Sequence, residues 1–242
     1  MISIFIKELN SFFDSLIAYL FIGVFLVAIG FFMWIYPQEN VLDLGFAEMN
    51  TLFSNAPYIL MFLISAATMR SFAEEKKSGT LELLFTKPLT DWQIVSGKFL
   101  ASYTIVIFSL LPTFVYYYSI YQLGDPKGNL DTPGIIGSYI GLFLLAGVFT
   151  ALGILASSLS ENQIVSFIYA LLLCYLFYTG FAAISGLDML KSLSEQVQML
   201  GIEYHYTSVS RGLVDSRDIV YFISVIIASL SGTKLVLESR NW

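Results

Sequence analysis

The sequence predicts an all-α integral membrane protein, a single domain over residues 1–242 with six transmembrane helices. Hydrophobic residues make up 57% of the chain and charged residues only 12%, and the mean hydropathy is +0.75. A soluble domain has about 25% charged residues. The uncharged runs are 15–38, 49–69, 99–124, 132–160, 162–187 and 219–233. All but the last reach the length of about 20 residues that crosses a bilayer as a helix.

Residues 1–14 predict an amphipathic helix that lies in the membrane interface ahead of the first span. Apolar side chains share one helical face: Ile2, Phe5, Ile6, Leu9, Phe12 and Phe13. The opposite face has Lys7, Glu8, Asn10 and Ser11. This pattern is typical of an interfacial helix. The alternative is a simple cytosolic extension of the first span.

The six spans are predicted near 16–36, 54–73, 99–121, 135–158, 162–185 and 218–237. Pro112 predicts a kink in the third span. The fourth span has small residues four apart at Gly137–Gly141, Gly147–Ala151 and Gly153–Ser157. They permit close helix packing, either within the subunit or across a dimer. The last uncharged run is short, so we expect Asp218 to cap its helix and Lys234 to extend to the interface.

The stretch 70–98 is the most densely charged part of the chain and lies between the second and third spans. Gly79 after two lysines predicts a helix end. Thr80 is expected to cap a short helix with Leu81, Leu84 and Phe85 on one face, which Pro88 stops. Thr90 and Gln93 then predict a capping box for the third span. The result is a short amphipathic helix at the membrane surface.

Residues 186–217 form the longest connection predicted on the outer side. Their apolar residues recur at roughly helical intervals: Leu187, Leu190, Leu193, Val197, Leu200 and Ile202. They predict one or two short helices at the outer interface. The only histidine, His205, is expected at the surface or interface, because one histidine is weak evidence for a metal. Arg211 and Asp215 are four apart and could form an exposed ion pair, which would stabilise the fold only weakly and set the entry angle of the last span.

The distribution of basic residues predicts the orientation. With the N-terminus inside, eight Lys and Arg lie on the inner side: Lys7, Arg70, Lys76, Lys77, Lys87, Lys98, Lys234 and Arg240. Four lie outside: Lys127, Lys191, Arg211 and Arg217. By the positive-inside rule, both termini and the stretch 70–98 are cytoplasmic.

The sequence also excludes several classes of protein. Gly97–Lys98 lacks the preceding glycine and the following Ser or Thr of a phosphate-binding loop, and the chain has no catalytic motif of a metalloprotease or serine hydrolase. We therefore expect no enzyme activity in this chain and no bound cofactor. A net charge of −6 argues against a nucleic-acid partner. The lone Cys174 allows neither an intrachain disulfide nor a cysteine metal cluster.

The run EEKKSGTLELLFTKPLTDWQIVSGK, from residue 74 to 98, resembles the signature of ABC-2-type transporter permeases. In that family a segment of the form E-x-x-x-G-T-x-E-x-L-L-x-x-P follows the second span. The stretch RGLVDSRD, from residue 211, also resembles the family's entry into its last span. Within the group, the chain looks most similar to the gliding-motility permease (GldF-like); copper-processing permeases of nitrous-oxide reductase systems resemble it too.

The resemblance implies a type V exporter-like fold with an N-terminal elbow helix (1–14), a cytoplasmic coupling-helix region (71–90) and an outer segment (186–217). It implies an ABC ATPase partner that binds ATP and Mg²⁺, a second permease copy or a paralogous membrane subunit, and the cytoplasmic membrane as location. The residues expected to couple to the ATPase are Glu74, Glu75, Gly79, Thr80, Glu82 and Leu83. The acids would meet basic groups of the partner, Gly79 would permit the turn and Leu83 would fill a pocket.

Three other interpretations compete with this one. The stretch 70–98 could be an ordinary polar loop that only sets topology. The chain could be a mechanotransmission or scaffold subunit of an envelope complex that transports nothing. An ion-coupled carrier is a third class, weakened because such carriers place ionisable groups near the bilayer midplane. Residues 15–187 have almost none within the predicted spans.

Overall fold

The computed structural model describes residues 1–37, 39–187, 193–212 and 214–239, and of Leu44 and Leu83 it describes the backbone alone. These residues fold into helices, without a strand among them. Six helical segments are long and apolar enough to cross a membrane, which confirms the predicted spans. They are Leu16–Trp34, Asn50–Lys77, Asp91–Leu123, Thr132–Leu159, Gln163–Ser185 and Ser216–Glu238.

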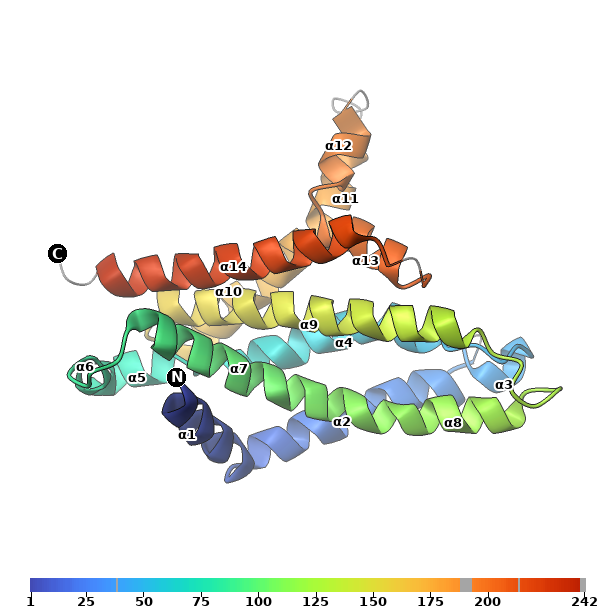
Figure 1. Ribbon diagram of the computed structural model, residues 1–242, viewed down its shortest axis with the longest axis horizontal. Coiled ribbons are helices and arrows are strands. Elements are labelled where there is room, and N and C mark those ends of the chain that lie inside the picture. The colour runs from blue at the N-terminus through green and yellow to red at the C-terminus, as the bar shows by residue number, and fades with distance from the viewer. Residues whose placement is uncertain (38, 188–192, 213, 240–242) are drawn as a thin grey trace.

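The fourth span, α9 (Thr132–Leu159), is the central helix of the bundle. It packs against α4 (Asn50–Thr68), α7 (Asp91–Leu110), α10 (Gln163–Tyr175) and α14 (Ser216–Glu238), and most of its residues are buried (Figure 1). By contrast, α2 (Leu16–Trp34), α10 and α14 leave most of their surface exposed. In a bilayer those surfaces face lipid or another membrane subunit.

Glycines on α9 allow this close packing. A Cβ at Gly153 would lie 2.1 Å from Thr68 Oγ1 of α4, and one at Gly147 would lie 3.0 Å from Ile226 of α14. A Cβ at Gly137 would lie 2.8 Å from the Cα of Gly212. The small residues of the fourth span therefore pack within the subunit, the first of the two alternatives.

The α-helix of the third span is interrupted in its middle by a short 3-10 turn. Thr90 and Gln93 form the predicted capping box at the start of α7. A 3-10 turn, η1 (Leu111–Thr113), then contains Pro112 before α8 (Phe114–Leu123) continues the span. The proline removes a helical hydrogen-bond donor, so the regular α-helix is interrupted where the kink was predicted.

The N-terminal helix α1 (Ile2–Phe13) lies beside α7, as Figure 1 shows. Its packing differs from the predicted division into an apolar and a polar face. Ile4 and Phe12 are buried against the protein, whereas Ile2 and Ile6 are exposed. The apolar side chains are thus divided between the bundle and the surface that a membrane interface would cover.

At the other end of the bundle, the connection between the last two spans forms the predicted short helices. After α10 come η2 (Leu176–Gly180) and α11 (Phe181–Ser185), which with α12 (Ser194–Gln198) project sideways from the bundle (Figure 1). Helix α13 (Ile202–Val209) returns to pack on the start of α9. Leu190, one of the apolar residues at helical spacing, and Lys191, one of the basic residues assigned to the outer side, lie outside the described residues.

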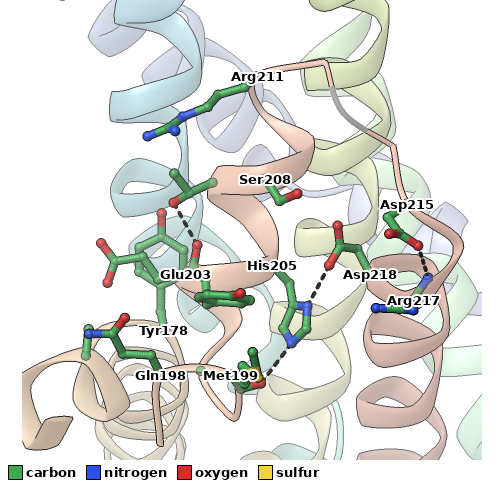
Figure 2. A pocket seen from close by; sticks show the side chains of 14 residues that line it. Tyr178, Gln198, Met199, Glu203, His205, Ser208, Arg211, Asp215, Arg217 and Asp218 are labelled. Atoms are coloured by element: carbon green, nitrogen blue, oxygen red, sulfur yellow. Dashed lines mark hydrogen bonds and ion pairs between the residues drawn. The ribbon is translucent and has the colours of Figure 1, made fainter. Parts of the chain in front are cut away.

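His205 pairs with Asp218 at this end, with 2.7 Å between Nδ1 and Oδ1 (Figure 2). Two expectations for this segment are wrong. Asp218 does not cap the last span; Asp215 does, by accepting a hydrogen bond from Arg217 N. Nor do Arg211 and Asp215 pair, since the chain turns between them at Gly212 with φ of 82° and they do not share a helix.

Candidate functional site

The charged stretch after the second span folds into two short helices at the end of the bundle where α1 lies (Figure 1). Helix α5 (Ala73–Lys77) ends at Ser78, and α6 (Thr80–Phe85) begins directly after Gly79. Gly79 has φ of 70°, a left-handed conformation that other residues adopt at a cost. The glycine therefore allows the chain to turn between two helices that are separated by only Ser78 and Gly79.

Four of the predicted coupling residues lie on the surface: Glu74, Gly79, Thr80 and Glu82. Leu83 lies in α6, and its side chain lies outside the described part of the structure. Thr80 does not cap α6 as expected. Gly79 occupies the cap position, and the Thr80 hydroxyl lies 2.8 Å from Ser78 Oγ.

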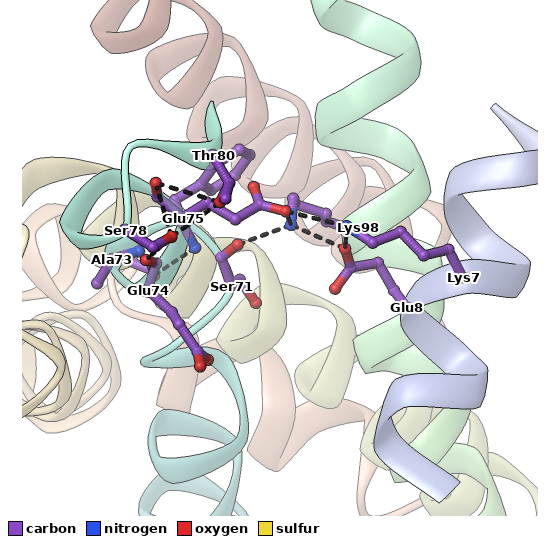
Figure 3. Close-up of polar contacts among 11 residues, drawn as sticks. Lys7, Glu8, Ser71, Ala73, Glu74, Glu75, Ser78, Thr80 and Lys98 are labelled. Atoms are coloured by element: carbon purple, nitrogen blue, oxygen red, sulfur yellow. Dashed lines mark hydrogen bonds and ion pairs between the residues drawn. The ribbon is translucent and has the colours of Figure 1, made fainter. Parts of the chain in front are cut away.

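The sixth predicted residue, Glu75, points into the protein and joins an ion cluster with Lys7, Glu8 and Lys98 (Figure 3). Glu75 Oε1 lies 3.1 Å from Lys98 Nζ and 3.2 Å from Lys7 Nζ. Glu8 Oε1 lies 3.0 Å from the same Lys98 nitrogen. The cluster thus connects α5, α1 and α7, and its four charges sum to zero.

Lys98 is the buried member of the cluster, with only 2% of its side chain exposed. Its ammonium also donates a 2.7 Å hydrogen bond to Ser71 O and lies 5.1 Å from the Phe72 ring centroid. Removing a lysine from water is costly unless its charge is paired and its donors are satisfied. Two carboxylates and a carbonyl meet both conditions here.

Lys7 occupies the solvent side of the cluster, with 60% of its side chain exposed. Partial burial alone would lower the pKa of Lys7, but the nearby Glu8 and Glu75 carboxylates outweigh it and raise the pKa above its ordinary value. Lys7 is therefore charged at neutral pH and supplies a second cation for the two acids.

Hydrogen bonds fix the start of α5 to the end of α9. Ser157 Oγ accepts from the backbone N–H groups of Phe72 and Ala73, at 3.0 and 3.2 Å, and donates to Met69 O at 2.9 Å. Lys76 Nζ donates to Ser158 O. Orphan amides at a helix start need such acceptors, so one buried serine both caps α5 and fixes its position.

Apolar packing fixes α6 in the same way. Leu81 is fully buried in a small core that includes Phe72, Ile94 and Leu237, with Leu84 packed at its edge. Phe85, predicted on the same buried face, is instead 37% exposed. The outer surface of α6 therefore includes the Phe85 ring as well as the Glu82 carboxylate.

A cavity of about 380 Å³ opens beside the ion cluster, and Glu75 lies in its wall. The second carboxylate oxygen, Oε2, is buried and has no hydrogen-bond partner among the described residues. An unsatisfied buried carboxylate oxygen is costly, and a donor from outside the chain would remove that cost.

Sequence reasoning missed three residues of this site: Glu8, Lys98 and Ser157. Glu8 was placed on the polar face of an interfacial helix, Lys98 was counted only for topology, and Ser157 only for its size. A lysine flanked by the apolar run that starts at Phe99 was the available signal, because such a lysine needs a partner when the helix packs.

Among the described residues, no group of three His, Cys, Asp or Glu side chains is arranged to hold a metal ion. A protein-family model with the description ABC-2 family transporter protein matches residues 43–202. That range is more than half of the chain and includes α5 and α6. No curated protein matches the sequence.

Proposed function

Because the chain belongs to the ABC-2 family of transporter membrane proteins, we propose that it is a permease subunit driven by a separate ATP-hydrolysing subunit, with α5 and α6 as the contact between them. The observation that supports this most directly is the pair of short helices itself. Their inner side is fixed to the bundle by Leu81, Glu75 and Ser157, and their outer side exposes Glu74 and Glu82.

The attachment of these helices offers a route for mechanical coupling. A push on α6 reaches the core through Leu81. A push on α5 reaches α7 through Glu75 and Lys98, α1 through Lys7, and α9 through Ser157. Displacing this unit would therefore move three elements of the bundle together, which is what a stroke of an ATPase beneath the membrane requires.

The structure suggests different roles for the three acids expected at the interface. Glu74 and Glu82 are free to meet basic groups of a partner. Glu75 has one oxygen occupied within the chain and a second oxygen, in the cavity wall, without a partner in the described region. A basic side chain of the ATPase entering the cavity would satisfy that oxygen.

We propose further that the complex is an exporter in the cytoplasmic membrane and serves gliding motility, for which the resemblance of the chain to the gliding-motility permease is the support. Both termini and α5–α6 would be cytoplasmic, where ATP is available. The ATPase would bind ATP and Mg²⁺, so this chain needs no cofactor of its own. A second copy or a paralogous membrane subunit would complete the pore against the exposed faces of the bundle.

Affinity purification of the chain from its native membrane in mild detergent tests the proposal. We expect a stoichiometric P-loop ATPase in the eluate, lost when Glu74→Lys and Glu82→Lys are combined. Glu195→Lys, an exposed acid on α12, is the matched control and should retain the ATPase. Recovery of the chain without an ATPase in several detergents would overturn the assignment.

A mechanotransmission subunit is the second candidate, favoured by the sideways projection of α11 and α12. Such an arm could act on an envelope partner without any cargo. A photo-crosslinker at the exposed Gln196 should then capture one envelope protein in stoichiometric yield. ATPase activity that rises with an added transport substrate would favour the permease instead.

A further inference from the structure

A second polar cavity lies far from the coupling helices, between α13, the start of α14 and the α11–α12 projection. Its volume is about 690 Å³. Figure 2 shows acidic, basic and aromatic side chains around it. The residues used below are Glu203, His205, Arg211, Arg217 and Asp218, all in its wall.

His205 connects the start of α14 to the chain between α12 and α13. Its Nδ1 lies 2.7 Å from Asp218 Oδ1 and its Nε2 lies 2.8 Å from Met199 O, and the ring stacks on Tyr221 at 3.9 Å between centroids. Both ring nitrogens and one oxygen of Asp218 are thus occupied within the chain.

Asp218 is left with one unused oxygen. Its side chain is only 8% exposed, Oδ1 is paired with His205, and Oδ2 is buried without a hydrogen-bond partner in the described region. A buried carboxylate oxygen without a donor is unfavourable. The wall of the cavity thus requires an N–H or O–H group from a molecule that enters it.

Three further charges in the wall have no ion pair or side-chain hydrogen bond within the described residues: the guanidinium groups of Arg211 and Arg217 and the carboxylate of Glu203. Burial raises the pKa of Glu203, which an adjacent cation would oppose. Two guanidinium groups suit a phosphate, and two carboxylates suit an ammonium.

The position of the cavity suits a headgroup. Helix α13 packs on the first turns of α9, where a Cβ at Gly141 would lie 2.9 Å from Val209. At 1.5 Å per residue α9 is about 42 Å long, so its ends extend past a hydrocarbon core of about 30 Å. The neighbouring spans expose apolar side chains, among them Leu176, Ile184 and Ile223, that acyl chains could contact.

We propose that this cavity binds the headgroup of a phospholipid that has both a phosphate and a primary ammonium, with its acyl chains along α10 and α14. Arg211 and Arg217 would bind the phosphate. Asp218 Oδ2 and Glu203 would accept hydrogen bonds from the ammonium. The inference depends on the membrane location of the chain and not on its coupling to an ATPase.

Native mass spectrometry of the delipidated full-length protein in detergent tests the site. The probes are short-chain phosphatidylethanolamine, the matching phosphatidylcholine and free phosphoethanolamine. We expect phosphatidylethanolamine to bind about tenfold more tightly than phosphatidylcholine, whose quaternary nitrogen has no N–H to donate. Glu203→Gln should reduce the difference in affinity between phosphatidylethanolamine and phosphatidylcholine.

The basic groups are tested separately. Arg211→Gln combined with Arg217→Gln should weaken phosphatidylethanolamine binding by about tenfold or more. Both residues are exposed, so an unchanged circular-dichroism melting curve should show that the variant folds. Lys127→Gln, an exposed cation at the same end of the bundle, is the control and should bind as the unmodified protein does.

Three results would overturn the proposal. One is equal binding of phosphatidylethanolamine and phosphatidylcholine. Another is a folded double arginine variant with undiminished binding. The third is free phosphoethanolamine binding as tightly as the lipid, which would assign the cavity to a soluble phosphoamine.

Discussion

Lys98 shows how a single residue can connect separate parts of this chain. It is buried, and its charge is compensated by Glu8, 90 residues earlier, and by Glu75. Neither partner could be predicted from spacing, because the contacts depend on how α1 and α5 pack against α7. The capping box of Thr90 and Gln93, by contrast, was predictable because its two partners are only three residues apart.

The two lysines of the ion cluster predict very different mutational costs. Lys98→Met leaves Glu8 and Glu75 without their buried cation and should lower the free energy of unfolding by about 3 kcal/mol. Lys7→Met removes a largely exposed partner and should cost less than about 1 kcal/mol. Denaturation by SDS in mixed micelles, followed by circular dichroism, measures both. Equal losses in the free energy of unfolding would show that Lys98 contributes no more to the stability of the cluster than Lys7 does.

His205 is the second residue whose role depends on distant packing. The sequence predicted a surface or interfacial position but not the contacts of the ring with Asp218 and Met199 O. Replacing Asp218 with Asn should therefore change the surroundings of His205 as well. We expect Asp218→Asn to shift the His205 imidazole signals in NMR, because it removes the carboxylate that contacts Nδ1, whereas Asp215→Asn should leave them unchanged.

At the scale of elements, the break between α5 and α6 was predictable because Gly79 follows a helix ending in two lysines. The assignment of Thr80 as the cap was wrong. Gly79 itself takes the cap position, and its positive φ turns the chain before α6 begins. Local sequence thus predicted where the turn occurs, and the φ of one residue decided which residue caps α6.

This conformation predicts a residue-type dependence at position 79. A Cβ there meets no atom within 4 Å, so backbone strain alone determines the outcome. Gly79→Val should cost about 1–2 kcal/mol, whereas Gly79→Asn should be tolerated. If α5 and α6 contact the ATPase, Gly79→Val should reduce ATPase recovery in affinity purification and Gly79→Asn should not. Equal ATPase recovery with the two variants would show that partner binding does not depend on the conformation of this turn.

The packing face of α9 gives a second element-scale prediction. Gly137→Ala places a methyl group 2.8 Å from Gly212, whose backbone is itself close to Gly134, and should cost about 1–3 kcal/mol. Gly23→Ala on α2 meets no atom within 4 Å and should stabilise the helix by about 0.5–1 kcal/mol. Thermal unfolding in detergent compares the two. A stabilising Gly137→Ala would contradict close contact between α9 and the 210–212 turn.

At the scale of the molecule, the number and order of the spans followed from hydropathy, because a run of about 20 apolar residues has few alternatives to a membrane helix. The sideways projection of α11 and α12 was not predictable. Its direction depends on η2, where the hydrogen-bonding pattern of the fifth span changes to that of a π-helix over Leu176–Gly180. Periodicity within the uncharged run 162–187 gives no sign of that change.

The last prediction concerns which end of the bundle faces the cytoplasm. Seven of the ten basic residues within the described ranges belong to the end with α1, α5 and α6, so that end should be inside. In a Cys174→Ser background, Ser78→Cys and Glu195→Cys each introduce one exposed thiol, on opposite sides by this topology. A membrane-impermeant maleimide should label Glu195→Cys in intact cells and Ser78→Cys only after permeabilisation. The reverse pattern would place α5 and α6 outside, where an ATPase has no ATP, and would reject the coupling role together with the orientation.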